Sequence, residues 1–184
     1  MGVAHRTLEL RDGALRMVVV ADTHGSPHPD WEGRISAEKP DCIVHAGDIG
    51  DLRVLTGLEK IAPLHAIRGN IDAPVEEIPE ALTLDLVASE RILLRILLVH
   101  IGVFGAKLRG EVAALARREG AALVICGHSH VPFIGSDRGI SIFNPGSIGP
   151  RRFQLPIVYG VLRLENGRVR MWHVDCETGK TWEP

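Results

Sequence analysis

The chain has 184 residues, of which 45% are hydrophobic and 24% are charged, and these proportions are ordinary for a globular domain. Lys and Arg total 21 against 23 for Asp and Glu, which gives a formal net charge of −2. That balance argues against strong nucleic-acid binding, because such proteins carry an excess of basic side chains.

Short aliphatic and β-branched runs, each followed by Gly, Asp, Asn or His, predict buried strands that lead into loops. In chain order, we expect strands at residues 17–21, 42–46 and 64–67, two within 82–99, and further ones at 123–126 and 140–143. Helices are expected at residues 31–39, 51–61 and 107–119, the last ending before a glycine. Residues 157–164 and 169–174 flank an Asn-Gly pair, which predicts a terminal antiparallel hairpin.

This order predicts one α/β domain over residues 1–184, with alternating strands and helices followed mostly by strands. Residues 1–16 are expected to add an edge strand, around Leu8–Leu10, and a turn, but no chemistry. Antiparallel edge strands leave a homodimer open. The longest apolar run, residues 92–106, is too short and too polar to cross a membrane, so no membrane partner is expected.

Three cysteines without Cys-x-x-Cys spacing, and a polar first stretch of chain, predict a reducing, cytoplasmic location. Cys126 is expected in the core. His45 and His65 lie inside apolar strands, and we interpret both as packed or hydrogen-bonded core residues rather than ligands.

Metal-ligating side chains follow five of the expected strands. They are Asp22 and His24, Asp48, Asn70, His100, and His128 with His130. Each motif alone is also typical of a turn or a helix cap. Because loops at the carboxyl ends of strands share one edge of an α/β sheet, the repetition predicts that these side chains converge. Residues i and i+2 of an extended chain point the same way, which favours convergence within each pair. Seven His, carboxylate and amide ligands are too many for one catalytic metal, so two divalent ions are expected.

These motifs, together with Asn144-Pro145-Gly146-Ser147, occur in the order found in the calcineurin-like metallophosphoesterases. From about residue 17 the chain resembles their small YfcE/MJ-type phosphodiesterase branch, which also includes the phosphoesterase-like subunit of retromer. The resemblance implies a sandwich of two β-sheets flanked by α-helices. It also implies two divalent metal ions per chain, Mn²⁺ first, with Fe²⁺, Zn²⁺, Ni²⁺ or Mg²⁺ as alternatives. One ion would be held by Asp22, His24, Asp48 and His130, and the other by Asp48, Asn70, His100 and His128, with Asp48 as the bridge.

Two departures from the family pattern affect the expected chemistry. The branch commonly reads His-Gly-His where this chain has His100-Ile101-Gly102, so the first histidine is kept and the second is missing. Larger members have a proton-donating histidine after the Gly-Asn motif, where this chain has Ile71. Asp72 either supplies a proton, if burial raises its pKa, or orients a ligand, which we favour.

The remaining site residues are expected to contact the substrate. Asn70 would help the metals to neutralise charge on the phosphoryl oxygens. Arg151 and Arg152 would bind the phosphate, the alternative being an ordinary solvated loop.

The sequence therefore predicts a divalent-metal-dependent phosphoesterase acting on a small-molecule phosphoester through a bridging hydroxide at a dinuclear site. A phosphodiesterase is favoured by the resemblance. The alternatives are a phosphomonoesterase and a protein-interaction scaffold with little or no catalysis, since fold alone does not establish activity. The retention of Asp48 and Asn70 favours an enzyme.

Overall fold

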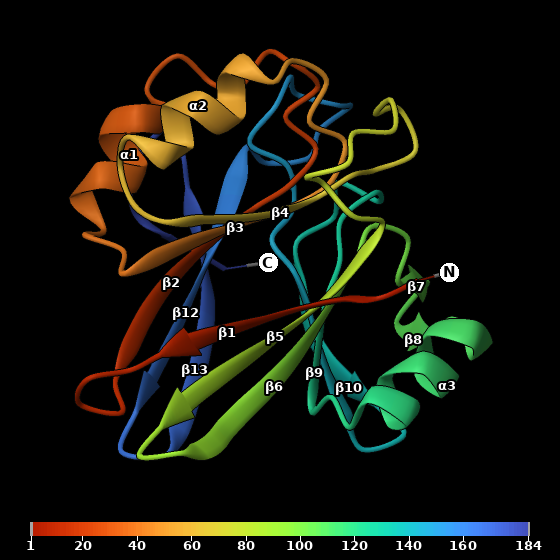
Figure 1. Ribbon diagram of the computed structural model, residues 1–184. Coiled ribbons are helices and arrows are strands. Elements are labelled where there is room, and N and C mark those ends of the chain that lie inside the picture. Colours follow the sequence, from red (N-terminus) through yellow and green to blue (C-terminus); the bar gives the residue numbers. More distant parts are fainter. Residues whose placement is uncertain (1, 184) are drawn as a thin grey trace.

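The computed structural model describes residues 2–183, which form seventeen helices and strands (Figure 1). The helices are α1 (Trp31–Ala37), α2 (Arg53–Glu59) and α3 (Gly110–Glu119). The strands are β1 (Ala4–Glu9), β2 (Leu15–Val20), β3 (Cys42–Ala46), β4 (Leu64–Ile67), β5 (Ala81–Ala88), β6 (Arg91–Val99), β7 (Val103–Phe104), β8 (Lys107–Leu108), β9 (Leu123–Ile125), β10 (Phe133–Asp137), β11 (Ile140–Asn144), β12 (Val158–Glu165), β13 (Arg168–Asp175) and β14 (Thr181–Trp182).

Most of these strands belong to two mixed six-stranded sheets that pack face to face. One sheet has the order β1-β5-β6-β9-β11-β10, and the other has the order β14-β13-β12-β2-β3-β4. Strand β2 shows how the sequence builds the layers, because its side chains alternate between the two faces. Met17 and Val19 join the core between the sheets, whereas Val18 and Val20 pack under α1 and α2. Helix α3 covers the outer face of the other sheet. The expected sandwich of two sheets flanked by helices is confirmed.

The ends of the chain follow the expected pattern with shifted boundaries. The edge strand expected near residue 8 is β1, which pairs parallel with β5 and begins earlier, at Ala4. The terminal hairpin is β12–β13, and both Asn166 (φ 52°) and Gly167 (φ 70°) have the left-handed backbone that a tight hairpin turn requires.

The expected helix at residues 107–119 is wrong at its start. Lys107 and Leu108 instead form β8, which pairs with β7 across a turn at Gly105 (φ 59°). The backbone N–H of Leu108 donates to Asp137, and Arg109 is extended (φ −58°, ψ 144°), so helix α3 begins only at Gly110. Strands β10 and β14 have no counterpart in the sequence prediction.

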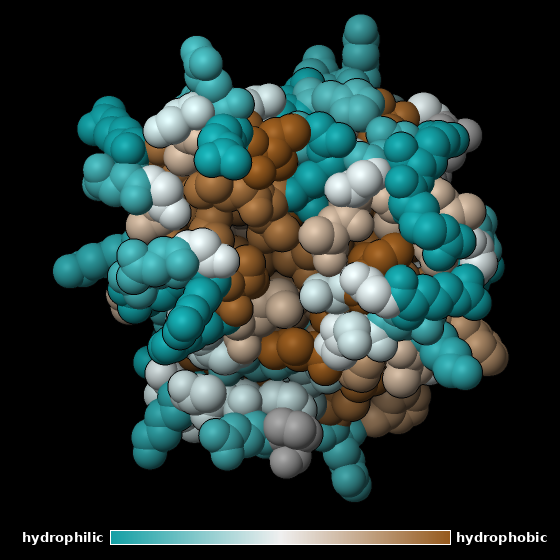
Figure 2. All heavy atoms as spheres, turned by 90° about the horizontal axis from the view of Figure 1, so that it is seen from below, coloured by the Kyte–Doolittle hydropathy of each residue, from teal (hydrophilic) through white to brown (hydrophobic). Residues whose placement is uncertain are grey.

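Parallel pairing brings the carboxyl ends of β2, β3 and β4 to one end of the sandwich, and those of β6 and β9 to the same end. The β5–β6 and β12–β13 hairpin tips lie at the opposite end. Figure 2 looks onto that opposite end and shows hydrophobic side chains in a central hollow between hydrophilic ones. Within residues 2–183, none of the helices has the length and hydropathy needed to cross a membrane.

Candidate metal centre

The loops after β2, β3, β4, β6 and β9 bring the seven expected ligand residues together. One nitrogen or oxygen from each of Asp22, His24 and His130 lies within 4.8 Å of the others. The same holds for Asp48, His100 and His128. These two triads match the two groups implied by the family resemblance. The oxygen ligands all follow strands of one sheet, and every imidazole except that of His24 follows strands of the other.

The two triads adjoin at Asp48. Its Oδ1 lies 3.1 Å from Nε2 of His100, and its Oδ2 lies 3.8 Å from Nε2 of His24, which belongs to the other triad. The side-chain oxygen of Asn70 is 2.9 Å from Nδ1 of His128. Asp48 thus has the position that a bridging carboxylate requires, and its bridging role stays a prediction.

Five of the seven residues have a left-handed backbone that non-glycine residues rarely adopt. They are Asp22 (φ 55°), His24 (φ 45°), Asp48 (φ 55°), His128 (φ 69°) and His130 (φ 59°). The side chains therefore converge because the chain turns sharply after each strand, not because residues i and i+2 of an extended segment share a face. Such backbone strain is concentrated at functional sites in many proteins.

A buried hydrogen-bond chain ties the first two loops together. The hydroxyl of Thr23 donates to the carbonyl of Ile49 (2.9 Å) and lies 3.0 Å from Nε2 of His45. Nδ1 of His45 accepts from the N–H of Gly47 (3.2 Å), so its Nε2–H donates to Thr23. Burial lowers the pKa of His45 to about 3, which keeps the ring neutral. His45 is thus a hydrogen-bonded core histidine, as expected, and it also positions the loops, which its place in the sequence did not indicate.

The Asn-Pro-Gly-Ser segment, residues 144–147, forms hydrogen bonds to the loops after β9 and β2. The Asn144 amide donates to the carbonyl of Gly127 (2.8 Å) and to the hydroxyl of Ser129 (3.0 Å). The Ser147 hydroxyl donates to the carbonyl of Asp22 (2.9 Å).

A side-chain carbon at Gly69 would lie 2.1 Å from Oδ1 of Asp48, so only glycine fits beside that carboxylate.

The donor set fits a divalent cation. The Nδ1–H of His100 donates to the carbonyl of Ala46 (2.7 Å), which leaves a lone pair on Nε2. That buried Nε2 has no hydrogen-bond partner among the described residues, and it faces the Asp48 carboxylate at 3.1 Å. Burial lowers the pKa of His100, so a proton does not reside on Nε2 at neutral pH. Two lone pairs facing each other at this distance are stabilised by a cation bound to both.

Within the triad of Asp22, His24 and His130, the pKa values of the carboxyl group and the imidazole are shifted in opposite directions. Burial, together with the neighbouring Asp48 carboxylate, raises the pKa of Asp22 to about 8. Its carboxylate accepts the backbone N–H of His128 at 3.0 and 3.1 Å. Burial, with Arg152 and His24 nearby, lowers the pKa of His130 to about 4. Without a metal, the site is therefore short of positive charge, with neutral imidazoles around acidic groups.

Asp72 is held by the backbone rather than poised to donate a proton. Its carboxylate accepts N–H groups from Gly69 (2.7 Å), Gly50 (2.9 Å) and Ile49 (3.1 Å). Burial raises its pKa, but the three hydrogen bonds outweigh that effect and the net pKa is lowered. The lowered pKa and the three backbone hydrogen bonds favour the orienting role of Asp72 over that of a proton donor, and its role stays a prediction.

The structure separates the two adjacent arginines. A side-chain nitrogen of Arg152 lies 3.2 Å from Nε2 of His24, at the edge of the cluster. Arg151 instead forms an ion pair with Glu177 and donates to the carbonyl of Leu155 (2.9 Å). Arg151 therefore contacts Glu177 rather than the cluster; phosphate binding by either arginine stays a prediction, and these contacts favour Arg152.

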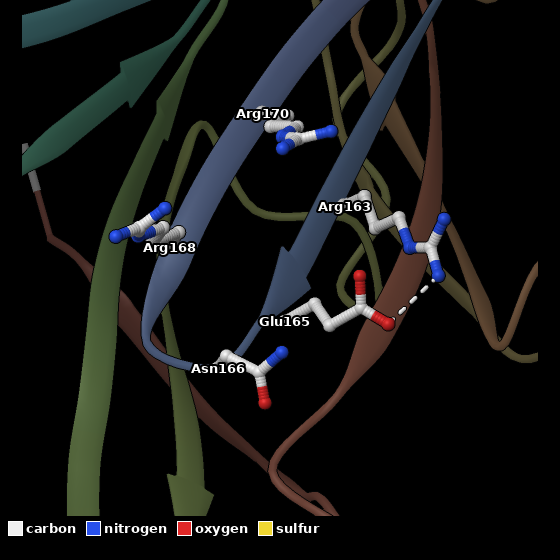
Figure 3. A pocket seen from close by; sticks show the side chains of 5 residues that line it. All are labelled: Arg163, Glu165, Asn166, Arg168 and Arg170. Atoms are coloured by element: carbon white, nitrogen blue, oxygen red, sulfur yellow. Dashed lines mark hydrogen bonds and ion pairs between the residues drawn. The ribbon is translucent and has the colours of Figure 1, made fainter.

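Away from the cluster, a hollow of about 270 Å³ lies at the β12–β13 turn, where Arg163 pairs with Glu165 (Figure 3). Arg168 and Arg170 extend from the neighbouring strand. It contains none of the clustered histidines and carboxylates and lies at the end of the sandwich opposite the seven-residue cluster. This hollow therefore lacks the imidazole groups that the cluster offers to a metal ion.

Comparison with known families agrees with this geometry. The family model described as the calcineurin-like phosphoesterase superfamily domain matches residues 15–167. The chain belongs to this family of metallophosphoesterases, which comprises hydrolases that bind divalent metals.

Individual relatives span nearly the whole chain. A probable metallophosphoesterase of Methanothermobacter thermautotrophicus is 30% identical over 173 residues, which cover 90% of this chain and 92% of that protein. The probable metallophosphoesterase YsnB of Bacillus subtilis is 28% identical over 154 residues, covering 83% and 86%. The structure of YfcE, a phosphoesterase from E. coli, aligns with a TM-score of 0.62 at 19% identity, covering 92% and 97%. Vacuolar protein sorting 29 from Cryptosporidium parvum aligns with a TM-score of 0.72 at 17% identity, covering 93% and 96%. The two solved structures share the fold with this chain.

Proposed function

We propose that this protein is a divalent-metal-dependent phosphodiesterase with two metal ions per chain. The observation that carries the proposal is the buried Nε2 of His100, which presents its lone pair to the Asp48 carboxylate at 3.1 Å inside a cluster of seven ligand-type residues. Asp22, His24 and His130 would hold one ion. Asn70, His100 and His128 would hold the other, with Asp48 shared between them.

Bound divalent cations would lower the pKa of a water molecule and stabilise negative charge on phosphoryl oxygens. The chain's own residues position the substrate. Arg152, at the His24 side of the cluster, would donate hydrogen bonds to a phosphoryl oxygen. The Asn70 amide, at the His128 side, would do the same from the opposite side through its N–H₂ group.

The absence of a raised pKa at Asp72 bears on the choice of substrate. If Asp72 orients a ligand and donates no proton to the departing oxygen, esters of acidic alcohols would be hydrolysed fastest. The resemblance to the small branch favours a phosphodiester over a phosphomonoester. Mn²⁺ is the first candidate metal, since the donors are imidazoles and oxygens without a thiolate.

The decisive experiment measures metal content and hydrolysis on the same preparations. After chelation, Mn²⁺, Fe²⁺, Zn²⁺, Ni²⁺ and Mg²⁺ are added back, and hydrolysis of bis-p-nitrophenyl phosphate is compared with that of p-nitrophenyl phosphate. We expect about two ions per chain and a metal-restored preference for the diester. Two bound ions with no turnover of either ester would instead favour an interaction scaffold, and a preference for the monoester would favour a phosphomonoesterase.

The two arginines provide a matched pair of variants. Arg152→Ala is expected to lower kcat/KM about 10- to 100-fold, because it removes a charged hydrogen bond to the phosphoryl group. Arg151→Ala removes the same side chain from the neighbouring position, where it pairs with Glu177, and leaves kcat/KM nearly unchanged. Equal losses in the two variants would contradict the assignment of phosphate binding to Arg152.

We also propose a cytoplasmic location. All three cysteines are buried free thiols, which suits a reducing compartment.

A further inference from the structure

A pocket of about 350 Å³ opens beside one half of the cluster. Asn70 and His100 form the wall that it shares with the metal centre, and Val99, Ile101 and Val112 supply its apolar surface. Arg152 lies on the other side, next to His24. A phosphoryl group bound between the two sides would therefore direct one of its substituents into this pocket.

The charges around the pocket are neutralised in pairs. Arg68 binds Glu80 at 2.6 Å, and Arg109 binds Glu111 at 2.6 Å. Each guanidinium thus already has a carboxylate partner, and the pocket offers no free cation for a second phosphate or a carboxylate. An uncharged substituent fits this environment, because the paired side chains can cover it without losing a hydrogen-bonded partner.

Backbone hydrogen bonds fix two of the segments that line the pocket. The N–H of Arg109 donates to the carbonyl of Gly102 (3.1 Å), and the N–H of Arg68 donates to the carbonyl of Pro79 (2.9 Å). Its volume lies at the lower end of the range for small-molecule pockets, which suits one ring-sized group rather than a whole nucleotide or a longer chain.

Exposed apolar side chains follow several of the site residues along the chain. Ile71, Ile101, Val131 and Phe153 each directly follow a site residue in the sequence, and each is more than a third exposed. We call these four residues the apolar rim. Of the four, Ile101 lines the pocket, and it stands where the sequence departs from the His-Gly-His pattern. Exposed apolar side chains grouped around a polar centre indicate contact with an apolar part of a ligand.

We propose that this pocket binds the non-departing arm of a phosphodiester, and that the arm is an uncharged aromatic or similarly sized apolar ring, with Ile101 as a specificity-determining residue. This inference rests on the proposed function, since it names the substrate class of the same site. The departing alcohol must leave on the side opposite the attacking oxygen, away from the ligand cluster. The pocket, whose wall includes Asn70 and His100, therefore receives the arm that stays on the phosphorus.

The test uses two diesters with the same leaving group, phenyl p-nitrophenyl phosphate and methyl p-nitrophenyl phosphate. A binding measurement accompanies the kinetic one. It uses methyl(phenyl)phosphinate and dimethylphosphinate, which also differ in a phenyl against a methyl group but cannot be hydrolysed, because both groups are joined to phosphorus by P–C bonds. Their dissociation constants are measured by calorimetry on the metal-loaded protein. We expect the wild-type protein to favour the phenyl compound about tenfold in both assays.

Ile101→Ala removes apolar contact from the pocket, and Ile101→Trp occupies it. Both changes are expected to reduce the phenyl preference to about threefold or less. Ile92→Ala is the matched control, because Ile92 is an exposed isoleucine near the start of β6, far from the cluster, and neither belongs to the apolar rim nor lines the pocket. It should keep the full preference.

The outcomes separate this inference from the proposed function. If Ile101 acted only by supporting His100, both diesters would lose rate in the same proportion, and the inference would be overturned. A wild-type protein without phenyl preference in either assay would overturn it as well. A protein that hydrolyses neither diester but binds the phenyl phosphinate more tightly, in a manner that depends on Ile101, would retain the pocket and remove the catalytic proposal.

Discussion

The buried His45 makes the stability of the metal-free protein strongly dependent on pH. Burial lowers its pKa from 6.5 to about 3 in the folded state, whereas the unfolded chain keeps the ordinary value. The stabilisation from the neutral ring is therefore complete above pH 6.5. It is lost as the pH falls toward 3, because the unfolded state then binds a proton that the folded state does not.

The magnitude follows from these two pKa values. At pH 5 an unfolded histidine of pKa 6.5 is almost fully protonated and a folded one of pKa about 3 is almost fully neutral. Linkage then gives a loss of about 2 kcal/mol in the free energy of unfolding between pH 7 and pH 5 from this one residue. Other histidines and carboxylates add to the total, so the contribution of His45 has to be isolated by difference.

The assay is urea unfolding of the chelated protein at pH 7 and at pH 5, for the wild type and for His45→Gln. Glutamine does not titrate, so the variant should lose about 2 kcal/mol less than the wild type over this interval, whatever its stability at pH 7. His28→Gln changes a partly buried histidine of the loop before α1, outside the Thr23–His45 hydrogen-bond chain, and serves as the control. Identical pH dependence in the wild type and His45→Gln would refute the reasoning.

Three further predictions concern the site. Because Asp22 has a pKa of about 8 without metal, metal binding at pH 7 should release about one proton per chain. Calorimetry in buffers of different ionisation enthalpy detects this release as a change in the measured heat. The affinity for metal should also rise between pH 6 and pH 8. An uptake of protons would contradict this. Gly69→Ala should displace the Asp48 carboxylate, since the added carbon would lie 2.1 Å from its Oδ1. The metal content measured by elemental analysis should therefore fall. An unchanged metal content would show that the loop moves to accommodate the added carbon and that the Asp48 carboxylate stays in place. Glu111→Lys releases Arg109 from its partner and adds a cation, so the protein should gain affinity for (4-carboxyphenyl)(methyl)phosphinate relative to methyl(phenyl)phosphinate. Equal affinity changes for the two compounds would show that Glu111 does not set the charge of the pocket.

Sequence patterns predicted the strands and the residues of the cluster, because both depend on local information. A run such as residues 42–46 reads as a buried strand, and a polar residue directly after it lies at the sheet edge whatever the details of the loop. The identity of the ligands followed from five repetitions of that arrangement.

Other features depend on contacts distant in the sequence. The pairing of Arg151 with Glu177 joins positions 26 residues apart, and the three N–H groups around Asp72 come from two separate loops. Aspartate is enriched among non-glycine residues with a left-handed backbone, but the residue type alone does not mark Asp22 and Asp48, because most aspartates adopt other conformations. Strand β10 was missed because Gly135 and Asp137 are typical of turns, and only pairing with β11 makes the segment a strand.

The division of the ligands between the two sheets has a mechanical consequence. His100 follows β6 of one sheet, yet its ring is fixed by the carbonyl of Ala46, which ends β3 of the other. A cation bound by His100 and Asp48 would therefore fasten the two halves of the sandwich to each other at one end. Any sliding of one sheet over the other would change the spacing of the donor atoms, so substitutions deep between the sheets should alter metal affinity as well as stability.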